Sequence, residues 1–367
     1  MLWTCTELME NTKTERIVWI DISKGVAILL VLLGHSMRDQ MRMASPVLDI
    51  LYRSIYIFHM TWFFWLAGYG YRLSKSRGRT PLQIAGKRLR KQLPYWIAYT
   101  LLIYAAFSLA MRNTYLNTIL SDAGYSRTGF ISYIFSTLLA NNPWAYHLWF
   151  LWVLIIITTI VCLSDSLADG RYTTYVCIFL IAIGLAGLAL RDNLTLGNWW
   201  LLFSYVSLYL PVFCLGILMA DMKVSDKSAW VWGALGLVYI VVRVKYFSDF
   251  SGNSLRVSGW TRFSVYLAGD ILLPGLMVLL GKVFEKGVLP FTESGKKNLI
   301  YLGKESLVIY LIHQPLCCAF LGTVLYKELR MPALAVMSIC IAVSLVLSII
   351  AVRLKRKMER SLLRRKP

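Results

Sequence analysis

The sequence predicts an all-α fold, a polytopic membrane helix bundle of about ten transmembrane helices with both termini in the cytoplasm. Apolar residues make up 57% of the 367-residue chain, charged residues only 16%, and the mean hydropathy is +0.59. A soluble domain averages about 45–50% apolar and about 25% charged residues. Apolar runs of about 20 residues, the length that spans a bilayer, follow one another to the C-terminal end of the chain.

The expected spans lie near residues 17–36, 47–71, 93–111, 146–164, 172–190, 199–219, 229–246, 263–284, 299–322 and 332–353. The N-terminal stretch has no basic segment of the kind that opens a signal peptide, and no small-residue cleavage site follows the first apolar run. We therefore expect that run to be retained as a span. Without an internal repeat or an appended soluble domain, we expect three parts: a cytoplasmic segment (1–16), a transmembrane domain (17–353) and a basic cytoplasmic tail (354–367).

The basic residues set the expected orientation. Residues 72–91 carry eight Lys and Arg without an acid, and the tail from Arg353 carries another eight with one Glu. Ten spans place both segments on one side, which the positive-inside rule makes cytoplasmic, although the outside loop 243–262 is also basic. The net charge of +20 is thereby explained without a nucleic-acid partner. The seven cysteines lie mostly in apolar runs and lack metal-ligand spacing, so we expect no disulfide and no metal.

The first span, "WIDISKGVAILLVLLGH", carries polar groups that hydrocarbon excludes: Asp21, Lys24 and His35. Eleven residues at about 100° each return His35 almost to the face of Lys24, roughly 17 Å along the helix axis. Asp21 precedes Lys24 by one turn on nearly the same face. An i,i+3 ion pair between Asp21 and Lys24 is the structural alternative, and it is compatible with a function.

All four histidines lie in or at the edge of expected spans: His35, His59, His147 and His313. Ionisable groups in a membrane are functional candidates because their burial is unfavourable. Each one alone is also explained as a hydrogen-bonded core histidine. In the expected topology three of them lie toward the outer half and His59 near the midplane, and this convergence favours a common site. Pro315 follows His313 closely enough to interrupt its helix.

Two further segments have both a structural and a functional explanation. Trp149 and Trp152 beside His147 form an aromatic anchor at the membrane interface or a platform for a sugar. At the cytoplasmic entry to the third span, the basic residues are Lys87, Arg88, Arg90 and Lys91. They form an anchor on anionic lipid, which composition alone favours, or a clamp for a diphosphate, since Arg88 and Lys91 share one helix face.

Together these motifs resemble the acyltransferase 3 family of membrane acyltransferases. "WIDISKGVAILLVLLGH" is similar to its first-span signature of Arg or Lys, ten residues and His. "IFHMTWFFWLAGY", "HLWFLWVL" and "GKESLVIYLIHQPL" resemble three further motifs. Glu305 stands where the family usually has Asn, and Lys91 takes the second position of a cytoplasmic Arg-x-x-Arg. The opening "WIDISKG" is most similar to a branch resembling fucose 4-O-acetylases.

The resemblance implies an O-acyltransferase, most often an O-acetyltransferase, of the plasma (inner) membrane that modifies a polysaccharide. Its co-substrate would be acetyl-CoA or another acyl-CoA from the cytoplasm, and its acceptor a hydroxyl of a cell-surface or lipid-linked sugar. His35 would be the general base, a role suited to an imidazole near neutral pH. Asp21 and Lys24 would shape the donor channel, and Lys24 or His59 could stabilise the oxyanion.

The remaining predicted site residues divide between the two substrates. Arg88 and Lys91, helped by Lys87, Arg90 and Lys24, would hold the coenzyme A phosphates. His313, His147, Trp149 and Trp152 would line the acceptor side. A transporter or flippase of a polar lipid or solute is the alternative, although the chain shows none of the paired broken helices typical of one. A catalytically inactive scaffold is a third possibility.

Overall fold

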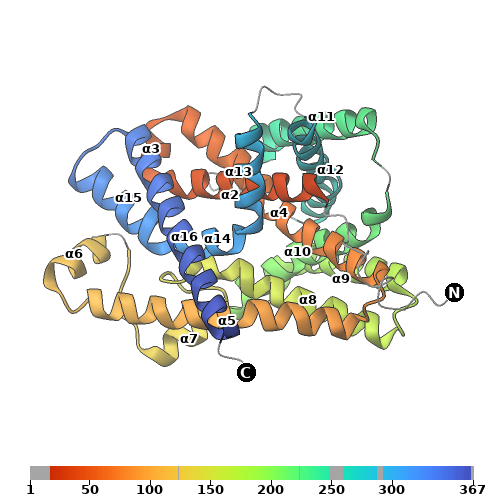
Figure 1. Ribbon diagram of the computed structural model, residues 1–367, viewed down its shortest axis with the longest axis horizontal. Coiled ribbons are helices and arrows are strands. Elements are labelled where there is room, and N and C mark those ends of the chain that lie inside the picture. The colour runs from red at the N-terminus through yellow and green to blue at the C-terminus, as the bar shows by residue number, and fades with distance from the viewer. Residues whose placement is uncertain (1–16, 123, 223, 248–258, 287–291, 365–367) are drawn as a thin grey trace.

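The computed structural model describes residues 17–364 apart from 123, 223, 248–258 and 287–291. The expected cytoplasmic segment 1–16, most of the basic loop 243–262 and the end of the tail thus lie outside the described residues. Within the described part of the chain every regular element is a helix and no strand occurs. The helices form one bundle (Figure 1), as an all-α membrane protein requires.

The long helices are α2 (Val18–Ser36), α4 (Pro46–Ser76), α5 (Pro81–Ala110), α8 (Trp149–Leu167), α9 (Thr173–Leu190), α10 (Trp200–Leu218), α11 (Asp226–Val242), α12 (Gly259–Glu285), α13 (Glu293–Lys304) and α16 (Ala333–Arg364). The short helical segments are α3 (Asp39–Ala44), α6 (Thr114–Asp122), α7 (Phe130–Leu138), α14 (Ser306–Ile312), α15 (Leu321–Thr323), η1 (Tyr146–Leu148), η2 (Arg191–Asn193), η3 (Gly197–Trp199), η4 (Met219–Asp221), η5 (Arg243–Phe247), η6 (His313–Phe320) and η7 (Val324–Glu328).

Nine helical stretches of the described chain are long and apolar enough to cross a membrane, and they correspond to nine of the ten expected spans. The expected span at 47–71 is the 31-residue helix α4, which mixes aromatic, polar and charged residues. Its middle, between Ile55 and Tyr71, is largely buried, and it packs on α2 and α10. The protein is therefore a multi-pass membrane protein in which a long helix with polar and charged residues occupies the interior.

Capping residues stabilise the starts of two of the helices that form the site. Ser45 caps α4 by accepting a hydrogen bond from the backbone N–H of Leu48, and Pro46 occupies the first turn. Thr80 and Gln83 form a capping box at the start of α5, where Pro81 occupies the first turn. Such side chains satisfy the N–H groups that a helix start leaves unbonded.

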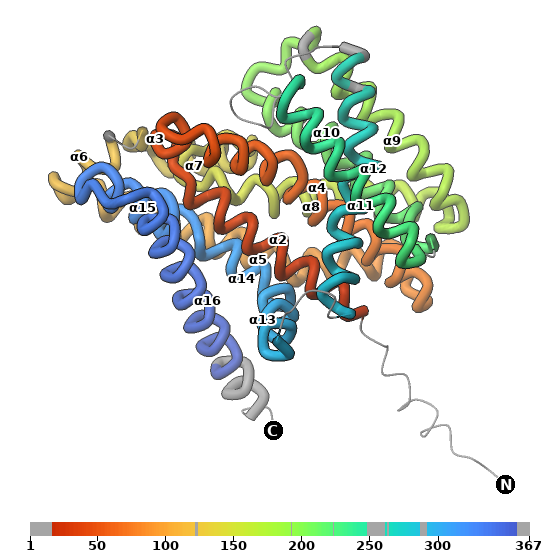
Figure 2. The backbone as a smooth tube through the Cα atoms, turned by 90° about the horizontal axis from the view of Figure 1, so that it is seen from above, coloured from red at the N-terminus to blue at the C-terminus, as the bar shows by residue number. Residues whose placement is uncertain are grey.

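Ion pairs join the helix ends on one side of the bundle, which we call the basic end. The pairs are Lys75–Asp165, Arg72–Asp221, Lys286–Asp226 and Arg356–Glu305. They join the end of α4 to the ends of α8 and η4, the end of α12 to the start of α11, and α16 to the residue before α14. In Figure 2 the start of α2, α13 and the last described turns of α16 lie at the lower side of the tube, whereas α3, α6 and α15 lie at the upper left.

Glycines let the central helices pack backbone against backbone. A Cβ added to Gly303 of α13 would lie 1.9 Å from the Asp21 carbonyl oxygen of α2, and one added to Gly25 would lie 2.2 Å from the Leu299 carbonyl oxygen. Gly68 of α4 lies equally close to the backbone of α10. Small residues commonly allow such contacts in membranes. They hold α2 against α13 and α4 against α10.

Candidate active site

Three of the four histidines, His35, His59 and His147, line one cavity of about 420 Å³, which we call the imidazole cavity. His35 lies in the last turn of α2, His59 in the middle of α4, and His147 in η1 before α8. His313 completes the group from behind, because its ring centroid lies 5.0 Å from that of His35 and 6.0 Å from that of His147. Four distant parts of the chain thus bring imidazoles together.

A break in the helix places His313. Helix α14 ends at Ile312, and Gln314 has extended backbone angles (φ −126°, ψ 151°) before Pro315. Proline has no backbone N–H and cannot continue a regular helix through this position. The interruption expected from Pro315 is therefore present, and His313 lies at the end of the intact helix.

Hydrogen bonds to the backbone fix the orientation of two rings. His59 Nδ1 lies 2.7 Å from the Ile55 carbonyl oxygen, and His313 Nδ1 lies 2.6 Å from the Tyr310 carbonyl oxygen. Because a carbonyl only accepts, each Nδ1 carries the proton and each neutral ring keeps its lone pair on Nε2. The His313 Nε2 atom is buried and has no hydrogen-bond partner among the described residues.

His35 is the histidine most open to the cavity. It is half-buried, whereas the other three are buried, with 5% exposure or less. Its Nδ1 lies 3.2 Å from the Tyr56 hydroxyl oxygen. Two protonated rings 5.0 Å apart, the separation of His35 and His313, would repel by about 3 kcal/mol at an effective dielectric constant of about 20. At most one ring of this pair is therefore charged at a time.

Aromatic side chains form most of the remaining wall of the imidazole cavity. Trp149 stacks on Tyr205 with ring centroids 4.1 Å apart. The hydroxyls of Tyr205 and Tyr146 form a hydrogen bond of 2.7 Å. Arg191 lines the same cavity and its guanidinium lies 5.3 Å from the ring centre of Trp200. In the described part of the chain no group of three or more His, Cys, Asp and Glu residues is arranged to hold a metal ion.

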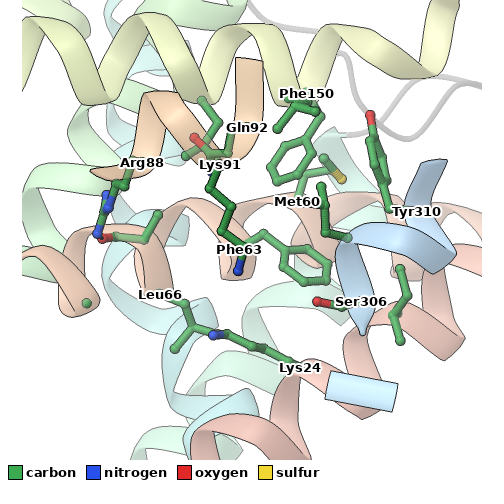
Figure 3. A pocket seen from close by; sticks show the side chains of 16 residues that line it. Lys24, Met60, Phe63, Leu66, Arg88, Lys91, Gln92, Phe150, Ser306 and Tyr310 are labelled. Atoms are coloured by element: carbon green, nitrogen blue, oxygen red, sulfur yellow. Dashed lines mark hydrogen bonds between the residues drawn. The ribbon is translucent and has the colours of Figure 1, made fainter. Parts of the chain in front are cut away.

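A second cavity, of about 330 Å³, lies on the side of the basic end and is lined by Lys24, Arg88 and Lys91. We call it the basic cavity. Figure 3 shows Lys24 and Lys91 extending toward each other, with Arg88 at the same end of the cavity. Arg88 donates from Nη2 to the Ala67 carbonyl oxygen at 2.6 Å, while its Nη1 is buried without a hydrogen-bond partner. Such a guanidinium can bind a phosphate oxygen.

The two cavities share two lining residues, Met60 of α4 and Tyr310 of α14, which we call the junction. In Figure 3 both junction residues lie at the end of the basic cavity away from Arg88. Between the cations and the junction the lining is mostly apolar, with Phe63 and Phe150. A continuous series of side chains therefore leads from three cations to the imidazoles.

Five of the residues predicted for the site line neither cavity: His313, which lies behind the imidazole cavity, and four others. Asp21 is buried where α2 meets α13, and Lys87 and Arg90 are exposed on α5. Trp152 stacks on Trp96 at 4.6 Å and donates to the Leu138 carbonyl oxygen at 2.8 Å. The structure thus separates these four from Lys24, Arg88, Lys91, Trp149 and the histidines, and their roles remain predictions.

Sequence reasoning had overlooked Tyr56 and Tyr310. Each lies three residues before a histidine of the cluster, and residues three apart share a helix face. Tyr56 contacts His35 and His59, and the Tyr310 ring centroid lies 5.7 Å from that of His313. A search for aromatic residues three positions before each histidine would have found both.

Comparison with known proteins gives one match. The model of the acyltransferase 3 family, described as an acyltransferase domain, matches residues 17–353. A search of curated proteins and a search of solved structures returned no match. The matched range covers all four histidines and the three cations of the basic cavity. The chain belongs to the acyltransferase 3 family and is a membrane-embedded acyltransferase.

Proposed function

We propose that the protein transfers an acyl group, which we expect to be acetyl, from acyl-CoA to a hydroxyl of a cell-surface or lipid-linked sugar. The single observation that supports this is the pair of cavities meeting at Met60 and Tyr310. One cavity presents cations to a polyanionic donor and the other presents imidazoles to a hydroxyl. An acyl transfer needs a site for the acyl donor and a site for the acceptor hydroxyl, and the two sites must meet.

The basic cavity suits the donor. Coenzyme A carries phosphate groups at one end and its acyl thioester at the other, joined by a long flexible arm. Lys24, Arg88 and Lys91 would bind the phosphates, because ammonium and guanidinium groups form charge-assisted hydrogen bonds with phosphate oxygens. The apolar lining beyond them would hold the arm. Along α2 from Lys24 to His35 the axial distance is roughly 17 Å.

His35 would act as the general base in a balanced transfer. In the tautomer that this role requires, Nδ1–H would donate to Tyr56 Oη, which lies 3.2 Å away, and Nε2 would take the proton of the sugar hydroxyl. The sugar oxygen bonds to the thioester carbon and the carbonyl electron pair moves onto the carbonyl oxygen. The resulting tetrahedral species collapses, the C–S bond breaks, and the coenzyme A sulfur receives the proton from His35. The products are an ester and the free thiol, and His35 returns to its neutral form.

The acceptor would enter from the opposite end. Trp149 and the tyrosines stacked on it offer flat faces to the C–H groups of a sugar ring. His147 and His313 would complete the wall around the reacting hydroxyl. By the positive-inside rule the basic end would face the cytoplasm, with both termini there, in the plasma (inner) membrane among anionic lipids.

The test compares the surface and lipid-linked glycans of cells with and without the protein by mass spectrometry. We expect each modified sugar to gain the mass of one acyl group, about 42 Da for acetyl. This gain should disappear with His35→Ala. Lys227→Ala, a change at an exposed residue of α11 that lines neither cavity, is the control and should retain it. An increment that survives His35→Ala would remove the proposed base. Wild-type protein that never releases coenzyme A thiol would contradict the acyl transfer itself and favour transport.

A further inference from the structure

The Tyr310 hydroxyl is a buried polar group that the described part of the protein does not fully satisfy. The side chain is 6% exposed, and within the described part of the chain its hydroxyl proton has no acceptor. Burying a hydroxyl without a partner is unfavourable by about 1–3 kcal/mol, so most buried hydroxyls are bonded. A hydroxyl that is buried at the junction of the two cavities despite this unfavourable free energy indicates a ligand that supplies the missing partner.

The surroundings of this hydroxyl favour negative charge. The backbone N–H groups of Phe150 and Leu151, in the first turn of the 19-residue helix α8, interact with its oxygen and leave its proton without an acceptor. The N-terminal turn of a helix has a positive electrostatic potential. The described lining of both cavities includes four cations, Lys24, Arg88, Lys91 and Arg191, and no Asp or Glu. An anion formed at the junction therefore meets a hydroxyl donor, a favourable helix end and no carboxylate.

The position also suits the reacting atoms. The Tyr310 ring centroid lies 5.7 Å from that of His313 and 6.0 Å from that of His147. Tyr310 and His35 both line the imidazole cavity, and Tyr310 also lines the basic cavity. A thioester carbonyl that arrives through the basic cavity must pass this side chain before it reaches His35.

The other side chains considered for the oxyanion fit it less well. His59 uses its Nδ1 proton on the Ile55 carbonyl oxygen, so the neutral ring has only a lone pair at Nε2 and cannot donate a second hydrogen bond. Lys24 lines the basic cavity, among the cations that suit the phosphates, and does not line the imidazole cavity. Tyr310 is the hydroxyl common to both cavities.

We propose that Tyr310 is a catalytic residue whose hydroxyl donates a hydrogen bond to the carbonyl oxygen of the transferring acyl group. This inference rests on the proposed function. When the sugar oxygen attacks the thioester carbon, the carbonyl oxygen gains the electron pair and Tyr310 stabilises that charge. When the C–S bond breaks, the electron pair returns to the carbonyl and the hydrogen bond weakens. Tyr310 keeps its proton throughout, and the proton from the sugar moves through His35.

The test is Tyr310→Phe, which removes one oxygen and keeps the ring. Membrane vesicles from cells that express each variant contain the natural acceptor and receive acetyl-CoA with a labelled acetyl group. Label in the glycan fraction and release of free thiol are measured together, and thermal unfolding is followed on purified protein. We expect kcat to fall about 100-fold or more, as when one oxyanion donor is removed elsewhere, with little change in KM for acetyl-CoA. The unfolding temperature should stay the same or rise, because the proton of the lost hydroxyl had no acceptor.

Tyr133→Phe is the matched control, because Tyr133 is also buried but its hydroxyl donates to the Thr100 carbonyl oxygen at 2.8 Å. It should lower the unfolding temperature and leave kcat per folded protein unchanged. Tyr310→Phe protein with wild-type kcat, or with an unfolding temperature lowered as in the control, would overturn the inference. So would an acetyl adduct on Tyr310 in the intact mass. Wild-type vesicles that release no thiol would instead overturn the proposed function, and the inference with it.

Discussion

Replacing Gly303 by alanine should disable the enzyme from a position that lines neither cavity. The added Cβ would lie 1.9 Å from the Asp21 carbonyl oxygen, whereas contacts under 3.0 Å essentially never occur. The backbones of α2 and α13 must therefore separate by about 1 Å, because a packed interior cannot absorb that overlap. Lys24 lies on α2, and Ser306 and Tyr310 lie on α14 directly after α13, so this movement changes the shape of the basic cavity.

The expected magnitude follows from that displacement. A misplacement of about 1 Å can lower a rate about 100-fold, and overpacking typically lowers the free energy of unfolding by about 1–3 kcal/mol. Label transfer from acetyl-CoA, normalised to folded protein, and thermal unfolding in detergent measure the two effects. The matched control is Gly86→Ala in α5, where the new Cβ would lie 3.6 Å from Arg90 Nη2, an ordinary contact.

In the control the substitution should leave activity unchanged and stabilise the helix by about 0.5–1 kcal/mol, because alanine is the better helix former. If Gly303→Ala behaved like Gly86→Ala in both assays, the close approach of α2 and α13 would not be what holds the basic cavity in shape. The reasoning from helix contact to catalysis would then be refuted.

Two further predictions concern charged side chains. Arg88→Lys should raise KM for acetyl-CoA about tenfold, because a lysine lacks the planar fork of a guanidinium. Lys227→Met, at an exposed residue of α11 that lines neither cavity, should change KM less than about twofold. Steady-state kinetics that give the two variants the same KM would contradict this. Lys75→Met should lower the free energy of unfolding by about 3–5 kcal/mol, because it leaves the buried Asp165 carboxylate without its cation. Arg72→Met, at an exposed ion pair, should lower it by only about 0–1 kcal/mol. Denaturant unfolding that gives the two variants the same stability would refute that comparison.

Much of the fold follows from the sequence because the membrane imposes lengths and compositions. Helices in lipid must satisfy their own backbone, so each apolar run of about 20 residues predicts a span. Helix periodicity places Lys24 and His35 on one face of α2. That all four histidines lie in expected spans already favoured a common site, and the structure places three of them around one cavity with His313 behind it.

Which helices pack against one another could not be predicted from the sequence. The contact of Gly303 with the Asp21 carbonyl and that of Gly68 with α10 decide which helices meet, and single glycines leave no periodic signal. The junction of Met60 and Tyr310 depends on these contacts, since the two residues lie on helices far apart in the chain. The side of α5 that faces the cavity also follows from packing, which selects Arg88 and Lys91 and leaves Lys87 exposed.

The most direct test of the account is a structure of the protein with a thioether analogue of acetyl-CoA, which keeps the carbonyl and cannot transfer the acyl group. We expect the diphosphate against Lys24, Arg88 and Lys91, and the acyl carbonyl at the junction within hydrogen-bond distance of the Tyr310 hydroxyl. His35 should face that carbonyl from the imidazole cavity. An analogue bound outside the basic cavity, or bound with its acyl end away from the junction, would contradict the account.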